Sequence, residues 1–118
     1  MESLFMTKHK VVLVPFPFDN LKSTKVRPAV CLTNPIGPYR HVVLAFITSR
    51  VPASPLPADF ILDSSDKAFS LTGLRVSSTI QLHRMVTVTT SLIRRELGRI
   101  PPRMQLQIEE RLKKLFDL

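Results

Sequence analysis

The chain has 118 residues, of which 44% are hydrophobic, so it is large enough to bury a core as one domain over residues 1–118. Its single cysteine, Cys31, excludes a disulfide within the chain and fits a reducing compartment. The formal net charge of +8 indicates an anionic partner, either nucleic acid or an acidic protein, whereas a basic face kept for solubility is the plainer alternative.

The first two predicted strands lie at residues 11–16 and 29–32, on either side of a polar connection. Both runs are short and rich in Val, which favours strands over a helix. Pro15 and Pro17 cannot donate to a strand ladder, so the first strand is expected to end at a sheet edge or a bulge. Arg27 lies where the connection enters the second strand. We therefore expect a fixed charge there, facing whatever the connection encloses.

Short apolar or β-branched runs between turn signals predict the other strands. These runs are residues 41–47, 59–62, 79–82 and 85–89. The run 41–47 is almost continuously apolar, which indicates burial on both faces. Residues 67–73 have no clear periodicity and are predicted as a loop. His83 and Arg84 stand between two runs and are expected at a turn or a bulge.

The C-terminal segment has the periodicity of a helix that begins near Pro102. Met104, Ile108 and Leu112 recur at helical spacing, and proline suits the first turn of a helix. The whole pattern predicts a mainly β domain of short antiparallel strands that is closed by one C-terminal helix. No run reaches the ~20 apolar residues of a membrane helix, and no secretory signal is visible, so a cytoplasmic protein is expected.

Cofactor chemistry has little support in the sequence. The three histidines, His9, His41 and His83, show no spacing typical of metal ligands. The three glycines form no phosphate-binding loop. We therefore expect neither a metal nor a nucleotide cofactor.

The remaining constellation is Arg27 at the start of one strand and Thr48 at the end of another. RNA cleavage needs no cofactor, because the 2′-hydroxyl is the nucleophile and the protein need only align it and stabilise the charged phosphorane. The forked donors of an arginine match phosphate oxygens, and a threonine hydroxyl can hold one more. The alternative is that Arg27 is a surface charge and Thr48 an ordinary strand-end residue.

Three blocks of the sequence carry a family resemblance. They are VVLVPFPFDNLKSTKVRPAVCLTN at 11–34, VVLAFITSR at 42–50 and LRVSSTIQLHRMVTVTTSLIRRELGRI at 74–100. In this order they resemble the MazF/PemK family of toxin endoribonucleases, and the likeness covers nearly the whole chain. The resemblance implies the toxin of a type II toxin–antitoxin system, built as a small SH3-like antiparallel barrel of the MazF/PemK/CcdB type. It also implies a homodimer, an acidic antitoxin partner, and metal-independent cleavage of single-stranded RNA by 2′-hydroxyl attack, the activity of an mRNA interferase.

The resemblance also assigns roles to individual residues. Arg27 falls on the catalytic arginine of the family and Thr48 on its catalytic threonine. Ser49 and Arg50, which follow Thr48 directly, are predicted to bind substrate. The other predicted substrate-binding residues fall on positions that line the RNA groove in relatives: Lys22, Ser23, Thr24, Lys25, Asn34 and Ser78.

Two departures from the family pattern stand out. His9 and Lys10 replace a usual Gly-Asp before the first strand, and Ser77 replaces an acidic residue. The second departure bears on base selection or proton handling. The alternative function is a non-catalytic barrel, either a CcdB-like protein that acts by protein contact or one that binds RNA or ribosomes, because a fold does not fix a function.

Overall fold

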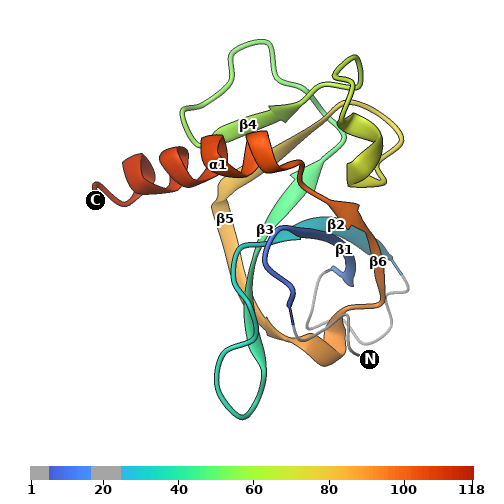
Figure 1. The fold of residues 1–118 in the computed structure, drawn as a ribbon, viewed down its shortest axis with the longest axis vertical. Coiled ribbons are helices and arrows are strands. Elements are labelled where there is room, and N and C mark those ends of the chain that lie inside the picture. Colours follow the sequence, from blue (N-terminus) through green and yellow to red (C-terminus); the bar gives the residue numbers. More distant parts are fainter. Residues whose placement is uncertain (1–5, 17–24) are drawn as a thin grey trace.

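The computed structural model describes residues 6–16 and 25–118, which form one six-stranded sheet and one α-helix (Figure 1). The strands are β1 (Lys10–Pro15), β2 (Val26–Cys31), β3 (His41–Thr48), β4 (Asp59–Leu62), β5 (Ser78–Thr89) and β6 (Arg95–Arg99). The 3₁₀ turns η2 (Phe69–Thr72) and η3 (Thr90–Leu92) and the helix α1 (Pro102–Leu115) complete the elements. Among the described residues, no helix is long and apolar enough to cross a membrane.

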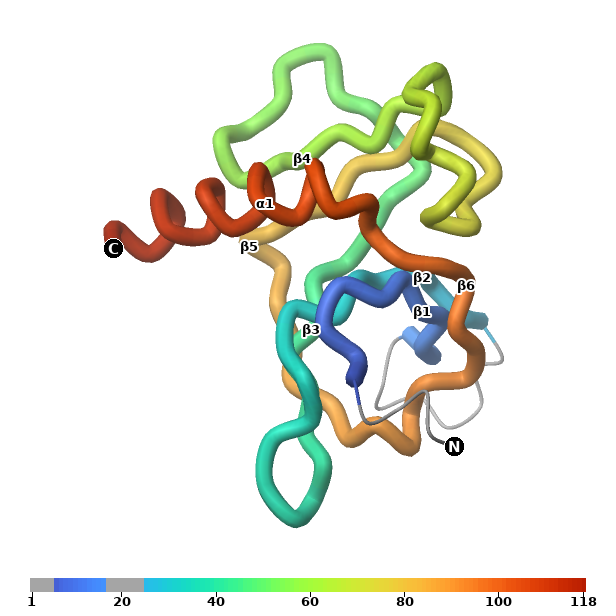
Figure 2. The backbone as a smooth tube through the Cα atoms, viewed as in Figure 1, coloured from blue at the N-terminus to red at the C-terminus, as the bar shows by residue number. Residues whose placement is uncertain are grey.

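Every strand pairs antiparallel with its neighbours, in the order β4-β5-β3-β2-β1-β6. The sheet curls into a half-barrel, and α1 lies across one side of it (Figures 1 and 2). The connection between β2 and β3 projects away from the body of the chain as a narrow hairpin (Figure 2). These features confirm the predicted mainly β fold with a C-terminal helix.

The curled sheet buries apolar side chains on both faces, and β3 contributes to both cores. Ala45 and Ile47 pack on the helix side, where Met104 and Ile108 of α1 complete the core. Val42, Leu44 and the half-buried Phe46 point to the opposite face, which we call the second core. Its buried members are Val12, Val14, Ala29, Cys31, Val42, Leu44 and Val88. The two-sided burial predicted for residues 41–47 is therefore confirmed.

A bulge of three residues interrupts the pairing of β5 with β3. Ala45 pairs with Met85, but the next residue, Phe46, pairs with Gln81. Three residues of β5, 82–84, are thus accommodated between two successive pairs, which bends the strand. The bulge confirms one of the two predicted alternatives, whereas the separate strands predicted at 79–82 and 85–89 are one continuous strand. His83 and Arg84 are exposed on this bulge.

Strand β6 was not predicted, and η2 lies where a loop was expected. The segment of β6, RELGR, has a single large apolar residue, Leu97, so it carries no strand signal of its own. Pairing with β1 makes it a strand, and Lys10 Nζ lies 3.1 Å from Glu96 Oε1 across that pair. Charged side chains suit β6, because an edge strand must avoid pairing with other chains.

The entrance to β1 explains one departure from the family pattern. His9 has φ +75°, a conformation that glycine adopts freely and that side-chain-bearing residues rarely adopt. Its amide donates to the carbonyl of Cys31 at 2.8 Å, and its carbonyl accepts from Ile100 at 2.8 Å. Burial lowers the pKa of His9, and the nearby Lys8 lowers it further, against the opposing effect of Glu109. His9 is therefore held at a glycine-like position by the chain on both sides.

Cys31 is a free cysteine that packs in the second core. Its side chain is fully buried, and burial raises the pKa of the thiol to about 12. A thiol needs its thiolate form to act as a nucleophile, so Cys31 is inert at neutral pH.

Candidate active site

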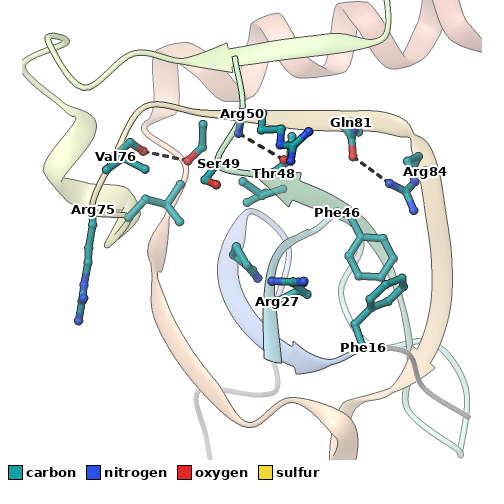
Figure 3. A pocket seen from close by; sticks show the side chains of 14 residues that line it. Phe16, Arg27, Phe46, Thr48, Ser49, Arg50, Arg75, Val76, Gln81 and Arg84 are labelled. Atoms are coloured by element: carbon teal, nitrogen blue, oxygen red, sulfur yellow. Dashed lines mark hydrogen bonds between the residues drawn. The ribbon is translucent and has the colours of Figure 1, made fainter. Parts of the chain in front are cut away.

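A cavity of about 520 Å³ opens at the end of β3, and we call it the main cavity (Figure 3). It is bordered by the start of β2, the end of β3, the first part of β5 and the segment that precedes β5. Its lining residues are Phe16, Arg27, Pro28, Phe46, Ile47, Thr48, Ser49, Arg50, Leu74, Arg75, Val76, Ser78, Gln81 and Arg84.

Strand alternation brings Arg27 and Thr48 to the same face. Ala29 of β2 pairs with Phe46 of β3, and both belong to the second core. Arg27 lies two residues before Ala29, and Thr48 lies two residues after Phe46, so both side chains point to that face. The second core ends at Ala29 and Phe46, and the main cavity begins next to them. Figure 3 shows Arg27 near the centre of the lining residues and Thr48 beside Arg50 at the end of β3.

Hydrogen bonds between threonine hydroxyls and the backbone of Arg50 hold Thr48 in place at the end of β3. The amide of Arg50 donates to Thr48 Oγ1 at 3.3 Å, which is the pattern of a short hydroxyl-capped turn. The carbonyl of Arg50 in turn accepts a hydrogen bond of 2.7 Å from Thr79 Oγ1. Thr79 is buried and lies opposite Thr48 in the β3–β5 pair. The turn after β3 is thus fixed from the neighbouring strand.

The main cavity is strongly cationic. Four arginines line it, Arg27, Arg50, Arg75 and Arg84, and no acidic residue is part of its described lining. In Figure 3 the side chain of Arg75 points away from the others, whereas Arg27 points to the centre. A cluster of guanidinium groups in a hollow concentrates anions and matches phosphate oxygens in a forked geometry.

An aromatic wall stands beside these charges. The rings of Phe16 and Phe46 meet edge to face with centroids 5.0 Å apart. The Arg84 guanidinium lies 6.0 Å from the centroid of Phe46 and donates to Gln81 Oε1 at 3.3 Å. The cavity therefore offers cations for phosphate groups next to flat surfaces on which bases can stack.

The structure places the predicted site residues in three groups. Five of them line the main cavity: Arg27, Thr48, Ser49, Arg50 and Ser78. Lys25 and Asn34 do not line it. The side-chain oxygen of Asn34 instead accepts a hydrogen bond of 3.1 Å from the amide of Lys8. Lys22, Ser23 and Thr24 fall outside the described residues.

Sequence reasoning missed several lining residues, among them Phe46, Gln81 and Arg84. The alternation of β3 could have placed Phe46 on the face of Thr48, and Gln81 is its partner in the β3–β5 pair, whereas Arg84 reaches the cavity from the bulge in β5. Ser77, the second departure from the family pattern, does not line the cavity. Its Oγ accepts from the amide of Ser64 at 2.8 Å and lies 2.9 Å from Ser64 Oγ, so it closes the turn after β4.

The chemistry available in the main cavity is that of charge and hydrogen bonding. Over residues 6–16 and 25–118, no three His, Cys, Asp or Glu side chains come together as metal ligands would. The guanidinium of Arg27 and the hydroxyl of Thr48 are suited to hold the oxygens of one phosphate group and to stabilise extra negative charge on them.

Comparison with solved structures shows that the fold is shared with known proteins. The chain is similar in structure to the Mycobacterium tuberculosis toxin MazF-mt6, with a TM-score of 0.66 and 20% identity over 92% of this chain and 97% of the toxin. It is also similar to MazF from Deinococcus radiodurans, with a TM-score of 0.65 and 19% identity over 94% and 96% of the two chains. A third solved structure is an endoribonuclease in complex with its cognate antitoxin from a mycobacterial species, with a TM-score of 0.67 and 16% identity over 94% of each chain.

The sequence comparisons give the family. A search of curated protein sequences finds no significant match. The profile of the family described as "PemK-like, MazF-like toxin of type II toxin-antitoxin system" matches residues 7–116, which is almost the whole chain. The similar folds and this match lead to one conclusion: the chain belongs to the PemK-like, MazF-like toxins of type II toxin–antitoxin systems.

Proposed function

We propose that the protein is a metal-independent endoribonuclease that cleaves single-stranded RNA, acting as the toxin of its toxin–antitoxin pair. The observation that carries the proposal is that Arg27 and Thr48, from two different strands, line one cationic cavity. A protein that only binds RNA needs cations but has no need of a fixed hydroxyl beside one of them. Membership of the family supports the same activity.

In the proposed reaction the 2′-oxygen of one nucleotide attacks the adjacent phosphorus. The O2′–P bond forms, the P–O5′ bond breaks, and the products carry a 2′,3′-cyclic phosphate and a 5′-hydroxyl. Arg27 stabilises the charge that develops on the phosphorane, and Thr48 donates a hydrogen bond to one of its oxygens. Because guanidinium groups stay protonated in proteins, Arg27 acts by charge. Solvent, which reaches the open cavity, takes the 2′-proton and supplies a proton to the leaving oxygen.

The proposed partners follow from the charge of the molecule. With a net charge of +8 and four arginines in its main cavity, the protein suits an acidic antitoxin segment that folds over the same cavity and excludes RNA. A similar solved structure does contain a cognate antitoxin, which supports this assignment. We further propose a homodimer, since a two-fold axis would join two cationic faces into a longer groove. We also propose that the protein acts in the cytoplasm, where messenger RNA is available.

The activity is tested with purified protein and a single-stranded RNA in the presence of EDTA. We expect cleavage without added metal, and fragments that carry a 2′,3′-cyclic phosphate and a 5′-hydroxyl, as identified by mass spectrometry. The matched control is the same strand with a 2′-deoxy nucleotide at the cleaved position, which lacks the nucleophile and stays intact. Cleavage that requires Mg²⁺, or RNA binding with no cleavage, would reject the proposed mechanism and favour a binding-only protein.

A further inference from the structure

A second cavity of about 460 Å³ adjoins the main cavity. Thr48, Arg50 and Gln81 line both cavities, so the two hollows share a wall. The far side of the second cavity comes from the connection between β3 and β4, which stands out from the sheet as a wide loop (Figures 1 and 2). His83, on the bulge of β5, completes the lining. A strand of RNA whose phosphate sits at Arg27 and Thr48 therefore has a hollow of nucleotide size directly beside that phosphate.

The two cavities differ in chemical character. The main cavity has four arginines, but only one of them, Arg50, also lines the second. The second cavity combines apolar surface from the loop, such as Pro52 and Leu56, with the polar ends of Gln81 and His83. Asp59 is buried, and its Oδ2 accepts a 2.8 Å hydrogen bond from the amide of Leu56, which ties the loop to β4. The apolar surface of the loop can contact the flat face of a base, and the polar groups opposite can form hydrogen bonds with its edge.

We propose that the second cavity holds the base of the nucleotide next to the scissile phosphate, with the base stacked on the imidazole of His83. The proposal rests on the proposed function, because the phosphate bound in the main cavity fixes the register of the strand. Unpaired bases stack on aromatic side chains, including histidine, when proteins read single-stranded RNA. His83 is exposed for such contact because the bulge carries it out of the paired ladder.

The test combines abasic substitutions in the RNA with His83→Ala. We expect that removing one particular base beside the cleaved bond lowers wild-type cleavage about tenfold, the effect of one stacked base. His83→Ala should lose about as much on intact RNA and become insensitive to that abasic site. His41→Ala is the matched control, because His41 is an exposed histidine that lines neither cavity. We expect it to keep the wild-type pattern.

Binding of an uncleavable strand, with 2′-deoxy at the scissile position, is measured in parallel for intact and abasic versions. If His83→Ala stays as sensitive to the abasic site as the wild type, the base subsite is wrong, while cleavage by the wild type still supports the proposed function. If the wild type cleaves no RNA, the proposed function is wrong. In that case equal affinity for intact and abasic strands also overturns the subsite.

The buried hydroxyl of Thr79 supports the turn that holds Thr48 at the main cavity. Thr79 borders the second cavity, but only 1% of it is exposed, so any effect on the rate is expected to pass through its hydrogen bond. Its Oγ1 donates to the carbonyl of Arg50 at 2.7 Å, and the amide of Arg50 donates to Thr48 Oγ1 at 3.3 Å. Because Thr48 Oγ1 already accepts this hydrogen bond, its own hydrogen is free to point into the main cavity.

We infer that Thr79 is a positioning residue that keeps the hydroxyl of Thr48 as a donor toward the phosphate. Thr79→Val keeps the shape of the side chain but loses this hydrogen bond. We expect it to lower kcat about tenfold with KM within about twofold, since small misplacements of reacting groups cost up to ~10²-fold. Thr79→Ser should restore the rate. Thr7→Val is the matched control, because Thr7 is equally buried and its Oγ1 donates to the carbonyl of Thr33 at 2.7 Å, away from the cavity.

The double variant Thr48→Val/Thr79→Val decides between positioning and general destabilisation. If Thr79 acts through Thr48, the second substitution causes no further loss of rate once Thr48 is replaced. The same tenfold loss in both backgrounds, or a Thr79→Val rate equal to that of Thr7→Val, would overturn the inference and leave the proposed function standing. A wild type without RNA cleavage would overturn both.

Discussion

Replacing Arg27 with alanine is expected to lower the rate of RNA cleavage about 10²- to 10³-fold while the protein stays folded. The expected loss is that of one preorganised group that stabilises transition-state charge. The fold should tolerate the change, because the Arg27 side chain is exposed and its backbone stays paired with Val14 of β1. Arg27→Lys keeps the charge but loses the forked geometry, so we expect an intermediate rate about tenfold below that of the wild type.

Single-turnover rates, measured together with RNA affinity, separate lost chemistry from lost binding. Arg95→Ala is the matched control. It removes one exposed cation from β6, outside both cavities, and leaves the main cavity intact. We expect a change of less than about threefold for Arg95→Ala, the size of a small long-range electrostatic effect. An Arg27→Ala protein that cleaves at the wild-type rate would remove Arg27 from the mechanism.

The largest loss of stability is expected at Gly73, where η2 crosses β6. Gly73 has φ +73°, and a Cβ atom there would collide with the backbone carbonyl of Leu97. The carbonyl of Leu97 is part of the backbone and not the end of a flexible side chain, so the backbone itself would have to move. We expect Gly73→Ala to lower the free energy of unfolding by about 4 kcal/mol, from left-handed strain and overpacking together. That is a large part of the stability of a typical domain.

Gly37→Ala provides the control for backbone strain, because Gly37 has nearly the same φ, +71°, and nothing within 4 Å of an added Cβ. We expect it to cost about 1 kcal/mol, the penalty of the left-handed conformation alone. Urea unfolding of both variants then gives the cost of the collision as the difference between them. Equal losses would mean that η2 can move away from β6, and that this crossing is not a rigid part of the fold.

The sequence was sufficient for the elements whose own residues determine them. β1, β3 and β4 lie within a residue or two of their predicted bounds, because apolar runs between turn signals leave few alternatives. β6 could not be found in this way. Its strand conformation comes from pairing with β1, and its charged residues suit an edge rather than a core. The continuity of β5 was hidden as well, since a bulge and a true break both interrupt the alternation.

For the candidate site, the sequence predicted Arg27 at the start of one strand and Thr48 at the end of another, and the family resemblance gave each a role. Their shared face follows from the pairing of Ala29 with Phe46, which the sequence alone does not show. The sequence predicted His83 and Arg84 only at a turn or a bulge between two strands, with no role at the site. Their positions beside the cavities depend on a pairing register that no local pattern encodes. Asn34 shows the opposite case, because a family position alone did not place it at the main cavity.

The bulge of β5 also separates residues that the pairing of the sheet constrains from residues that it leaves open. The paired residues on either side of it, Met85 and Gln81, hold the ladder to β3 whatever lies between them. Residues 83 and 84 can therefore change in chemistry, and the bulge in length, without a shift in register that would turn the core outward. Substitutions at these few unpaired residues can thus change the surface of the bulge, while the half-barrel that carries Arg27 and Thr48 keeps its shape.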